Sequence, residues 1–225
     1  MLKKTVAIAI DGPAGAGKST IARKLAEKTG YIYVDTGALY RTVALSISRN
    51  GIDPMDISAV VSHIAEIAVD IKYIDGEQRV ILNGEDVSEL IRTPEVSMTA
   101  SVTSAIPEVR AFLLGLQRKL AKEHNVVMDG RDIATVVLPD AKVKVFLTAS
   151  PEIRARRRYD ELVLKGQKVE FDDVLADIIK RDAQDMNREV DPLRQAEDAV
   201  LVDTTHMTED EVIDTIASIV EEKRA

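Results

Sequence analysis

A glycine-rich loop near the start of the chain carries the clearest chemical signal. Residues 12–19 read G-P-A-G-A-G-K-S and match the pattern G-x-x-x-x-G-K-[ST], directly after an apolar run at residues 5–10. Glycines in such a loop let successive backbone N–H groups surround a phosphate, and the lysine places a positive charge against the β- and γ-phosphates. The helix that follows points its positive end at the same anion. The pattern predicts binding of a nucleoside triphosphate; the alternative is a ligand-free glycine turn.

The residues expected to contact the triphosphate are Gly12, Pro13, Ala14, Gly15, Ala16, Gly17, Lys18, Ser19 and Thr20. The Ser19 hydroxyl is placed to reach Mg²⁺, which prefers oxygen ligands and accompanies phosphates. We therefore expect a magnesium ion whose protein ligand is Ser19.

Arginines stand where predicted strands end. Arg41 lies on a helix that follows the strand at residues 31–34, and Arg131 with Asp132 follows the strand at residues 125–128. Ligands of open α/β sheets bind at the carboxyl edge of the strands. An arginine fork suits a phosphate better than a lysine does. The shared placement predicts anion binding, although each arginine taken singly could form a surface salt bridge.

Two late helices carry further charged residues. They are Arg154, Arg156, Arg157 and Arg158 in the first, and Arg181, Asp185 and Arg188, spaced i, i+4, i+7, in the second. One interpretation is an exposed ladder of ion pairs, worth roughly 0.3–0.5 kcal/mol per pair. Four arginines within five positions repel one another, however, and an incoming polyphosphate would relieve that repulsion. We expect an arginine-rich lid at residues 150–170 that closes over ATP.

The elements that must position these residues alternate along the chain. Apolar runs of strand length alternate with segments of helical period, which predicts a parallel sheet with crossover helices. Expected strands are residues 5–10, 31–34, 125–128, 143–148 and 199–202, and expected helices include residues 21–28, 39–49 and 109–122. Ser150-Pro151 begins a further helix, and Thr208 with Glu211 forms a capping box for the last one.

Residues 69–87 break this alternation. Three short strands at residues 69–74, 77–82 and 85–87 are joined by Asp75-Gly76 and Asn83-Gly84, the strongest two-residue hairpin signals. A meander of this size is not stable alone, so we place it in an insert at residues 60–100. The insert is either a decoration or a flap that clasps substrate.

The predicted fold class is therefore α/β. We expect one domain of residues 1–225 with the three-layer P-loop NTPase fold. It has a five-stranded parallel sheet, an inserted three-stranded antiparallel subdomain and an arginine-rich lid.

Composition limits the function classes. The net charge of −8 argues against a nucleic-acid binder, and the absence of cysteine excludes disulfides and thiolate zinc sites. No run approaches the roughly 20 apolar residues of a membrane span. We expect a soluble, cytoplasmic monomer that binds neither nucleic acid nor membrane.

Phosphoryl transfer suits a site rich in arginine and poor in histidine. Catalysis consists mostly of positioning and of neutralising charge on the migrating group by Lys, Arg and Mg²⁺. An acceptor that is itself a phosphate is already ionised at neutral pH, so no strong general base is required.

The sequence resembles the bacterial cytidylate kinases, a branch of the nucleoside monophosphate kinases, over nearly its whole length. The resemblance is carried by residues 11–20, 35–41, 91–96 and 129–132, by Arg181-Asp182 and Asn187-Arg188, and by the inserted meander. It implies transfer of the γ-phosphoryl group of ATP to CMP or dCMP, giving ADP and CDP or dCDP, in pyrimidine nucleotide metabolism. The insert would then bind the monophosphate.

The resemblance also implies roles for single residues. Ser101, Arg110 and Asp132 would read cytosine, Arg41, Arg131 and Arg188 would hold the acceptor phosphate near Tyr40 and Thr36, and Arg181 with Asp185 would meet the sugar hydroxyls. A carboxylate can accept a hydrogen bond from the cytosine amino group, and an arginine can donate hydrogen bonds to the N3 and O2 acceptors of the base. The implied catalytic set is Lys18, Arg131, Arg188, Arg154, Arg157 and Arg158. The resemblance does not indicate which of the lid arginines touches the migrating phosphoryl group.

Alternatives remain at this point. Ser101 could be a helix-surface serine, Arg110 could pair with Glu108, and Tyr40 could be a core residue. A kinase of the same fold acting on UMP or on a non-nucleotide phosphate is a second enzyme hypothesis. A hypothesis of a different class is a nucleotide-gated binding module, a GTPase-like switch, although the guanine-reading Asn-Lys-x-Asp motif is missing.

Overall fold

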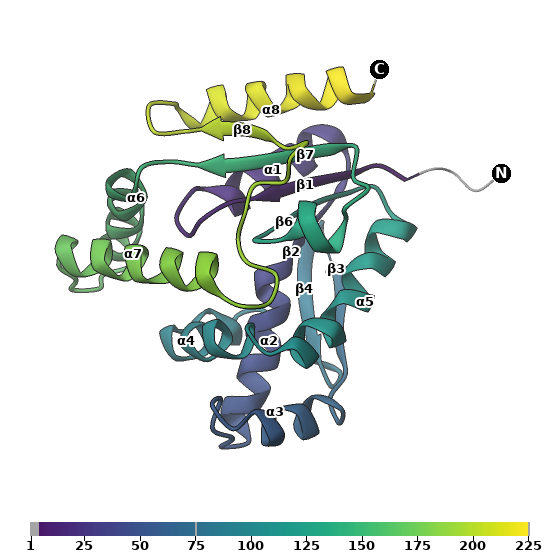
Figure 1. Cartoon of the computed structure of the whole chain (residues 1–225), viewed down its shortest axis with the longest axis vertical. Helices are drawn as coiled ribbons and strands as arrows, with labels where there is room; N and C mark the ends of the chain where they lie inside the picture. Colours follow the sequence, from purple (N-terminus) through teal and green to yellow (C-terminus); the bar gives the residue numbers. More distant parts are fainter. Residues whose placement is uncertain (1–4, 75, 225) are drawn as a thin grey trace. The chain divides into compact units, whose positions relative to one another are not determined.

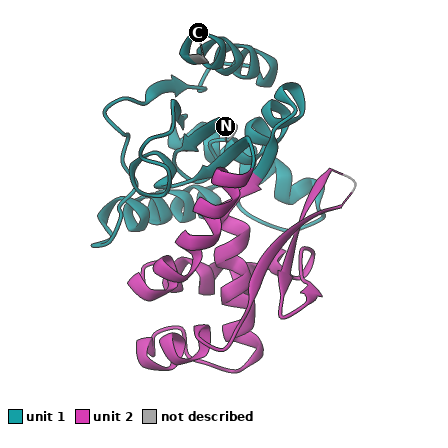
Figure 2. Cartoon of the chain, turned by 90° about the vertical axis from the view of Figure 1, so that its right-hand side faces the viewer, with its two compact units in different colours: residues 1–33, 124–225 teal, residues 34–123 magenta. Residues whose placement is uncertain are grey.

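The computed structural model describes residues 5–74 and 76–224, so Asp75 of the predicted Asp75-Gly76 turn lies outside the described residues (Figure 1). The chain divides into two compact units. The first comprises residues 1–33 and 124–225, and the second comprises residues 34–123 (Figure 2). In the described part of the chain, no helix is long and apolar enough to cross a membrane.

A five-stranded parallel sheet confirms the predicted fold class. Its strands run in the order β2 (Ile32–Asp35), β6 (Val126–Gly130), β1 (Ala7–Asp11), β7 (Val143–Thr148) and β8 (Val200–Asp203). The central strand β1 pairs with β6 on one side and with β7 on the other. Its residues Ile8, Ala9 and Ile10 are fully buried, which explains the continuous apolar run in the sequence.

Two helices of the first unit pack on this sheet. Helix α1 (Lys18–Thr29) and helix α8 (Glu209–Arg224) lie together in Figure 1. Ile21 and Leu25 of α1 and Ile216 of α8 share a core with Ile8 and Ile10. The predicted capping box is confirmed, because the Thr208 hydroxyl accepts from the Glu211 N–H while the Glu211 carboxylate accepts from the Thr208 N–H. This packing sets the first turn of α1 at the carboxyl edge of β1.

A helical hairpin follows β7 at the same edge. It consists of α6 (Pro151–Leu164), with the predicted Ser150 cap, and α7 (Phe171–Asn187), and the two helices are in contact (Figure 1). Ala155, Val174 and Ile178 form a small separate core, with Tyr159 and Phe171 in edge-to-face contact. The hairpin therefore has its own apolar support.

The second unit contains the separate antiparallel sheet that the hairpin signals predict. Its strands are β3 (Val69–Ile74), β4 (Glu77–Leu82) and β5 (Glu85–Asp86), and its helices are α2 (Thr36–Arg49), α3 (Ile57–Ile64), η1 (Leu90–Arg92), α4 (Pro94–Thr103) and α5 (Pro107–Glu123). Asn83 and Gly84 adopt φ of 50° and 89°, as a hairpin turn of this kind requires. Helix α2 packs on α4 and β4, so this unit extends beyond residues 60–100.

Gly12→Ala is expected to destabilise the fold strongly. Gly12 has φ of 151°, and a Cβ there would lie 1.9 Å from the Leu147 carbonyl oxygen of β7. Backbone strain and overpacking together predict a loss of about 3 kcal/mol in the free energy of unfolding, measured by urea denaturation. Gly30→Ala is the control, because its φ is 68° but nothing lies within 4 Å of the added Cβ; we expect about 1 kcal/mol there. Equal losses for the two variants would contradict the steric argument.

Candidate nucleotide-binding site

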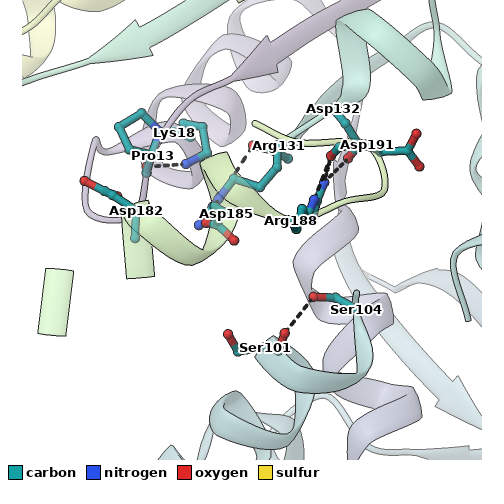
Figure 3. A network of polar contacts seen from close by, with 12 residues as sticks. Pro13, Lys18, Ser101, Ser104, Arg131, Asp132, Asp182, Asp185, Arg188 and Asp191 are labelled. Atoms are coloured by element: carbon teal, nitrogen blue, oxygen red, sulfur yellow. Dashed lines mark hydrogen bonds and ion pairs between the residues drawn. The ribbon is translucent and has the colours of Figure 1, made fainter. Parts of the chain in front are cut away.

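The glycine-rich loop joins β1 to α1 in a conformation that requires its glycines. Gly12, Gly15 and Gly17 all have positive φ, and Gly17 forms the N-cap of α1 without a side-chain capping bond. The Lys18 side chain folds back over the loop, where its Nζ donates to the Pro13 carbonyl at 2.7 Å (Figure 3). Backbone N–H groups and a lysine are thus gathered around one loop, as phosphate binding demands.

Lys18 has an unusual protonation equilibrium. The residue is 5% exposed. Burial, with the nearby positive charge of Arg131, lowers the pKa of Lys18 to about 7, although the carboxylates of Asp129 and Asp11 oppose that shift. An anion bound at the loop would favour the charged form of the lysine.

The first turn of α1 and the end of β6 meet at a carboxylate that the sequence analysis did not single out. Ser19 Oγ donates to Asp129 Oδ2 at 3.0 Å, and the Tyr33 hydroxyl donates to Asp129 Oδ1 at 2.9 Å. A hydroxyl and a buried carboxylate beside a triphosphate loop are a suitable donor set for Mg²⁺. The signal was available, because Asp129 is an acidic residue at the end of the strand beside β1.

The described residues contain no cluster of three or more His, Cys, Asp or Glu side chains able to hold a metal ion alone. A magnesium ion at Ser19 and Asp129 would therefore take most of its ligands from phosphates and water, as Mg²⁺ usually does.

The end of α7 brings several predicted residues together with the turn after β6. Arg131 Nε donates to Asp185 Oδ2 at 2.7 Å, and Arg188 Nη2 lies 3.7 Å from Asp132 Oδ1. Arg188 also donates through Nε to the Asp191 carbonyl at 2.6 Å, and its Nη2 donates to the same oxygen (Figure 3). Two arginines and two carboxylates thus share one small region, whereas Arg181 is exposed on α7.

The predicted lid arginines occupy three different environments. Arg154 is 3% exposed and binds the carbonyls of Ala149 and Ala14, each at 2.9 Å, and the Asp182 carboxylate at 2.6 Å. Arg157 donates to the Thr204 hydroxyl at 3.0 Å and carbonyl at 2.8 Å. Arg158 is paired with Glu161 in a solvent-exposed contact. The structure ties Arg154 to the glycine-rich loop itself.

A cavity of about 450 Å³ opens beside the loop. Its lining includes Gly15, Thr20, Arg157, Arg158, Thr204 and Met207. It thus combines loop backbone, two lid arginines and the segment after β8. A site of this volume and mixed lining suits a nucleoside.

The other predicted residues belong to the second unit. Arg41 Nη2 pairs with Asp35 Oδ2 at 3.0 Å, and the guanidinium of Arg110 lies 5.7 Å from the centre of the Tyr40 ring. Arg110 is buried and donates to the Ser104 carbonyl at 3.3 Å.

Thr36 and Ser101 complete this second set. Thr36 is buried at the first position of α2, and Ser101 lies partly buried on α4, where its carbonyl accepts from Ser104 Oγ at 3.1 Å. The structure therefore brings Tyr40 and Arg110 together. It places the predicted residues in two sets, one on each unit.

Comparisons with known proteins agree over nearly the whole chain. The sequence model of the family described as Cytidylate kinase matches residues 8–222. The chain is 51% identical over 216 residues to the cytidylate kinase of Caldicellulosiruptor bescii, covering 96% of each chain. It is 54% identical over 216 residues to that of Caldanaerobacter subterraneus subsp. tengcongensis, covering 96% of this chain and 95% of that one. An uncharacterized protein of known structure from Eubacterium ventriosum shares the fold, with a TM-score of 0.54 and 14% identity over 97% of this chain and 99% of that chain.

Proposed function

Because the chain belongs to the cytidylate kinase family, we propose that it transfers the γ-phosphoryl group of ATP to CMP or dCMP. The products are ADP and CDP or dCDP. The observation that carries the proposal is the identity of about half of all residues with cytidylate kinases over 96% of the chain. The glycine-rich loop with Lys18 supports the donor side of the reaction.

On the donor side, residues 12–20 bind the triphosphate and the cavity lined by Arg157 and Thr204 receives the adenosine. Mg²⁺ neutralises charge on the phosphates when it is bound, and Ser19 with Asp129 behind it is the place for it. Lys18 is released from the Pro13 carbonyl by the phosphates.

On the acceptor side, Arg131 and Arg188 hold the phosphate, assisted by Arg41 and by Tyr40 packing nearby. Asp132 accepts a hydrogen bond from the cytosine amino group, and Ser101 and Arg110 also contact the base. Asp185 and Arg181 take the sugar hydroxyls, and Thr36 contributes its hydroxyl. Support comes from the grouping of Arg131, Asp132, Asp185 and Arg188 at one edge.

Transfer itself needs little covalent help. An oxygen of the acceptor phosphate forms a bond to the γ-phosphorus while the bond to the ADP oxygen breaks. Arg131, Arg188, Arg157, Arg158 and Lys18 neutralise the charge that spreads over the migrating group. Buried Arg154 acts through the loop, because its guanidinium binds the Ala14 carbonyl at 2.9 Å.

The wider setting belongs to the same proposal. The kinase serves pyrimidine nucleotide metabolism in the cytoplasm as a monomer that binds nucleotides and neither nucleic acid nor membrane. Residues 60–100 bind the monophosphate, and residues 150–170 form the lid of a single kinase domain. Sedimentation at micromolar concentration tests the monomer, and a dimer would overturn that part alone.

The function is tested by ADP release with ATP and Mg²⁺ against CMP, dCMP, UMP, AMP, GMP and dTMP, each with a no-acceptor control. Fast release with CMP and dCMP alone is the expected result. Faster release with another acceptor would refute the base assignment, and release that needs no acceptor would refute the kinase.

ATP binding at pH 8 is expected to take up a proton. With a pKa of about 7, most Lys18 is neutral at pH 8 in the free protein, and the triphosphate favours its charged form. Uptake should approach about one proton per ATP, and affinity should fall as pH rises above 7. Calorimetry in two buffers of different ionisation enthalpy measures the uptake, and no uptake at pH 8 would contradict the assignment.

A further inference from the structure

Asp11, the last residue of β1, is aimed at the segment that carries Asp132. Its Oδ1 accepts from the Ile133 N–H at 2.8 Å, and its Oδ2 accepts from the Ala134 N–H at 2.7 Å. The residue is 1% exposed. Asp11 precedes the glycine-rich loop, yet both of its carboxylate oxygens serve the backbone more than 120 residues further along the chain.

Ile133 and Ala134 begin η2 (Ile133–Val137), a single turn of π-helix with Asp132 at its N-cap. The first N–H groups of a helix lack partners within the helix, and an aspartate at the N-cap usually accepts from them. Asp132 makes no such capping bond with its side chain. Asp11 supplies the acceptors from the neighbouring strand instead.

Because Asp11 accepts from the first N–H groups of η2, the Asp132 carboxylate is available to bind the base in the proposed reaction. Asp132 is 4% exposed. Its Oδ1 lies 3.7 Å from Arg188 Nη2, so the carboxylate faces Arg188 rather than the start of η2 (Figure 3). A binding carboxylate must be held to within about 0.5 Å of the productive geometry. The backbone directly after Asp132 is held by the two bonds from the Ile133 and Ala134 N–H groups to Asp11.

We infer that Asp11 is a positioning residue for recognition of the acceptor base: it caps η2 in place of Asp132 and thereby orients the Asp132 carboxylate toward cytosine. This inference rests on the proposed function and deepens it. It also links the first strand of the donor site to the residue that reads the acceptor.

Asp11→Asn removes one of the two acceptors with almost no change in shape, because an amide has one oxygen and its NH₂ group would face a backbone N–H. The shift in Asp132 should lower kcat/KM for CMP by about 10- to 100-fold. The KM for ATP should rise less than that for CMP, because the glycine-rich loop keeps its hydrogen bonds and Asp11 acts on Lys18 only through its charge, with no hydrogen bond between them among the described contacts. The ratio of kcat/KM for CMP to kcat/KM for UMP should fall as well.

A purely structural role is separated from positioning by a double variant. If Asp11 acts through Asp132, adding Asp11→Asn to Asp132→Asn should cause little further loss in kcat/KM for CMP, because coupled residues are not additive. If the two losses multiply, or if Asp11→Asn raises the KM for ATP as much as that for CMP, the inference is wrong.

The control is Asp56→Asn, the same isosteric change at the N-cap of α3, where Oδ1 accepts from the Ala59 N–H at 3.0 Å. We expect its kinetic constants to match those of the wild type. Wild-type activity with CMP is measured in the same assay, so that its absence would refute the proposed function rather than the role of Asp11.

If Asp11→Asn fails to fold, hydrogen exchange of the wild-type protein tests whether the turn capped by Asp11 is coupled to binding of the base. CMP should slow exchange at the Ile133 and Ala134 amides more than UMP does, relative to the Val145 amide in β7, because binding to Asp132 stabilises the capped turn. Equal slowing by CMP and UMP would overturn the inference.

Discussion

Lys18→Ala should lower kcat by about 100- to 1,000-fold while the fold stays intact. The Lys18 ammonium lies over the glycine-rich loop, 2.7 Å from the Pro13 carbonyl. The alanine leaves the migrating phosphoryl group without that charge. The hydrogen bond that is lost goes to a neutral carbonyl, and the buried Asp11 carboxylate keeps its bonds from the Ile133 and Ala134 N–H groups. ADP release at saturating ATP and CMP measures the effect, and urea denaturation checks the fold.

Lys24→Ala is the matched control for this variant. Lys24 lies on the same helix, but its side chain is half exposed and pairs with Glu209. Its removal should leave kcat unchanged, because surface ion pairs contribute little. Near-normal turnover in Lys18→Ala would refute the assignment of the glycine-rich loop to the donor phosphates.

Asp132→Asn should lower kcat/KM for CMP by at least about 100-fold while the KM for ATP changes little. An ionised carboxylate accepts the amino group of cytosine, whereas the asparagine amide carries no charge and can donate to the carbonyl oxygen that uracil has in its place. The loss with UMP should therefore be smaller. Steady-state kinetics with CMP and UMP measure the ratio.

Asp173→Asn provides the comparison, because Asp173 is an exposed carboxylate in the first turn of α7. The same loss of charge there should leave both acceptors unaffected. Equal losses for CMP and UMP in Asp132→Asn would show that Asp132 does not read the amino group.

Features that depend on neighbouring residues could be predicted from the sequence. The spacing of glycines before Lys18 predicts the loop, because positive φ at Gly12, Gly15 and Gly17 is a local requirement. Asn83-Gly84 predicts its hairpin for the same reason. The parallel sheet follows from continuous apolar strands separated by helical segments.

Features that depend on distant contacts could not be predicted in this way. The pairing of Ser19 with Asp129 and of Asp11 with η2 joins positions more than 100 residues apart. The sequence places Arg154 in the predicted lid, but its bond to the Ala14 carbonyl depends on a contact between positions 140 residues apart. Helices α3 and α4 were not predicted, and α4, with the sequence PEVSMTASVT, has only a weak apolar stripe.

The small core of the α6–α7 hairpin has a consequence for motion. Arg156 lies 4.5 Å from the centre of the Phe171 ring and 5.5 Å from that of Tyr159, which adds to the apolar contacts between the two helices. If residues 150–170 close over ATP as proposed, a segment with its own core should move as a rigid body rather than by local unfolding. Because Arg154 anchors the first turn of α6 to the glycine-rich loop, we expect the proposed closure to pivot at that end and to move the tip near Gly166 furthest.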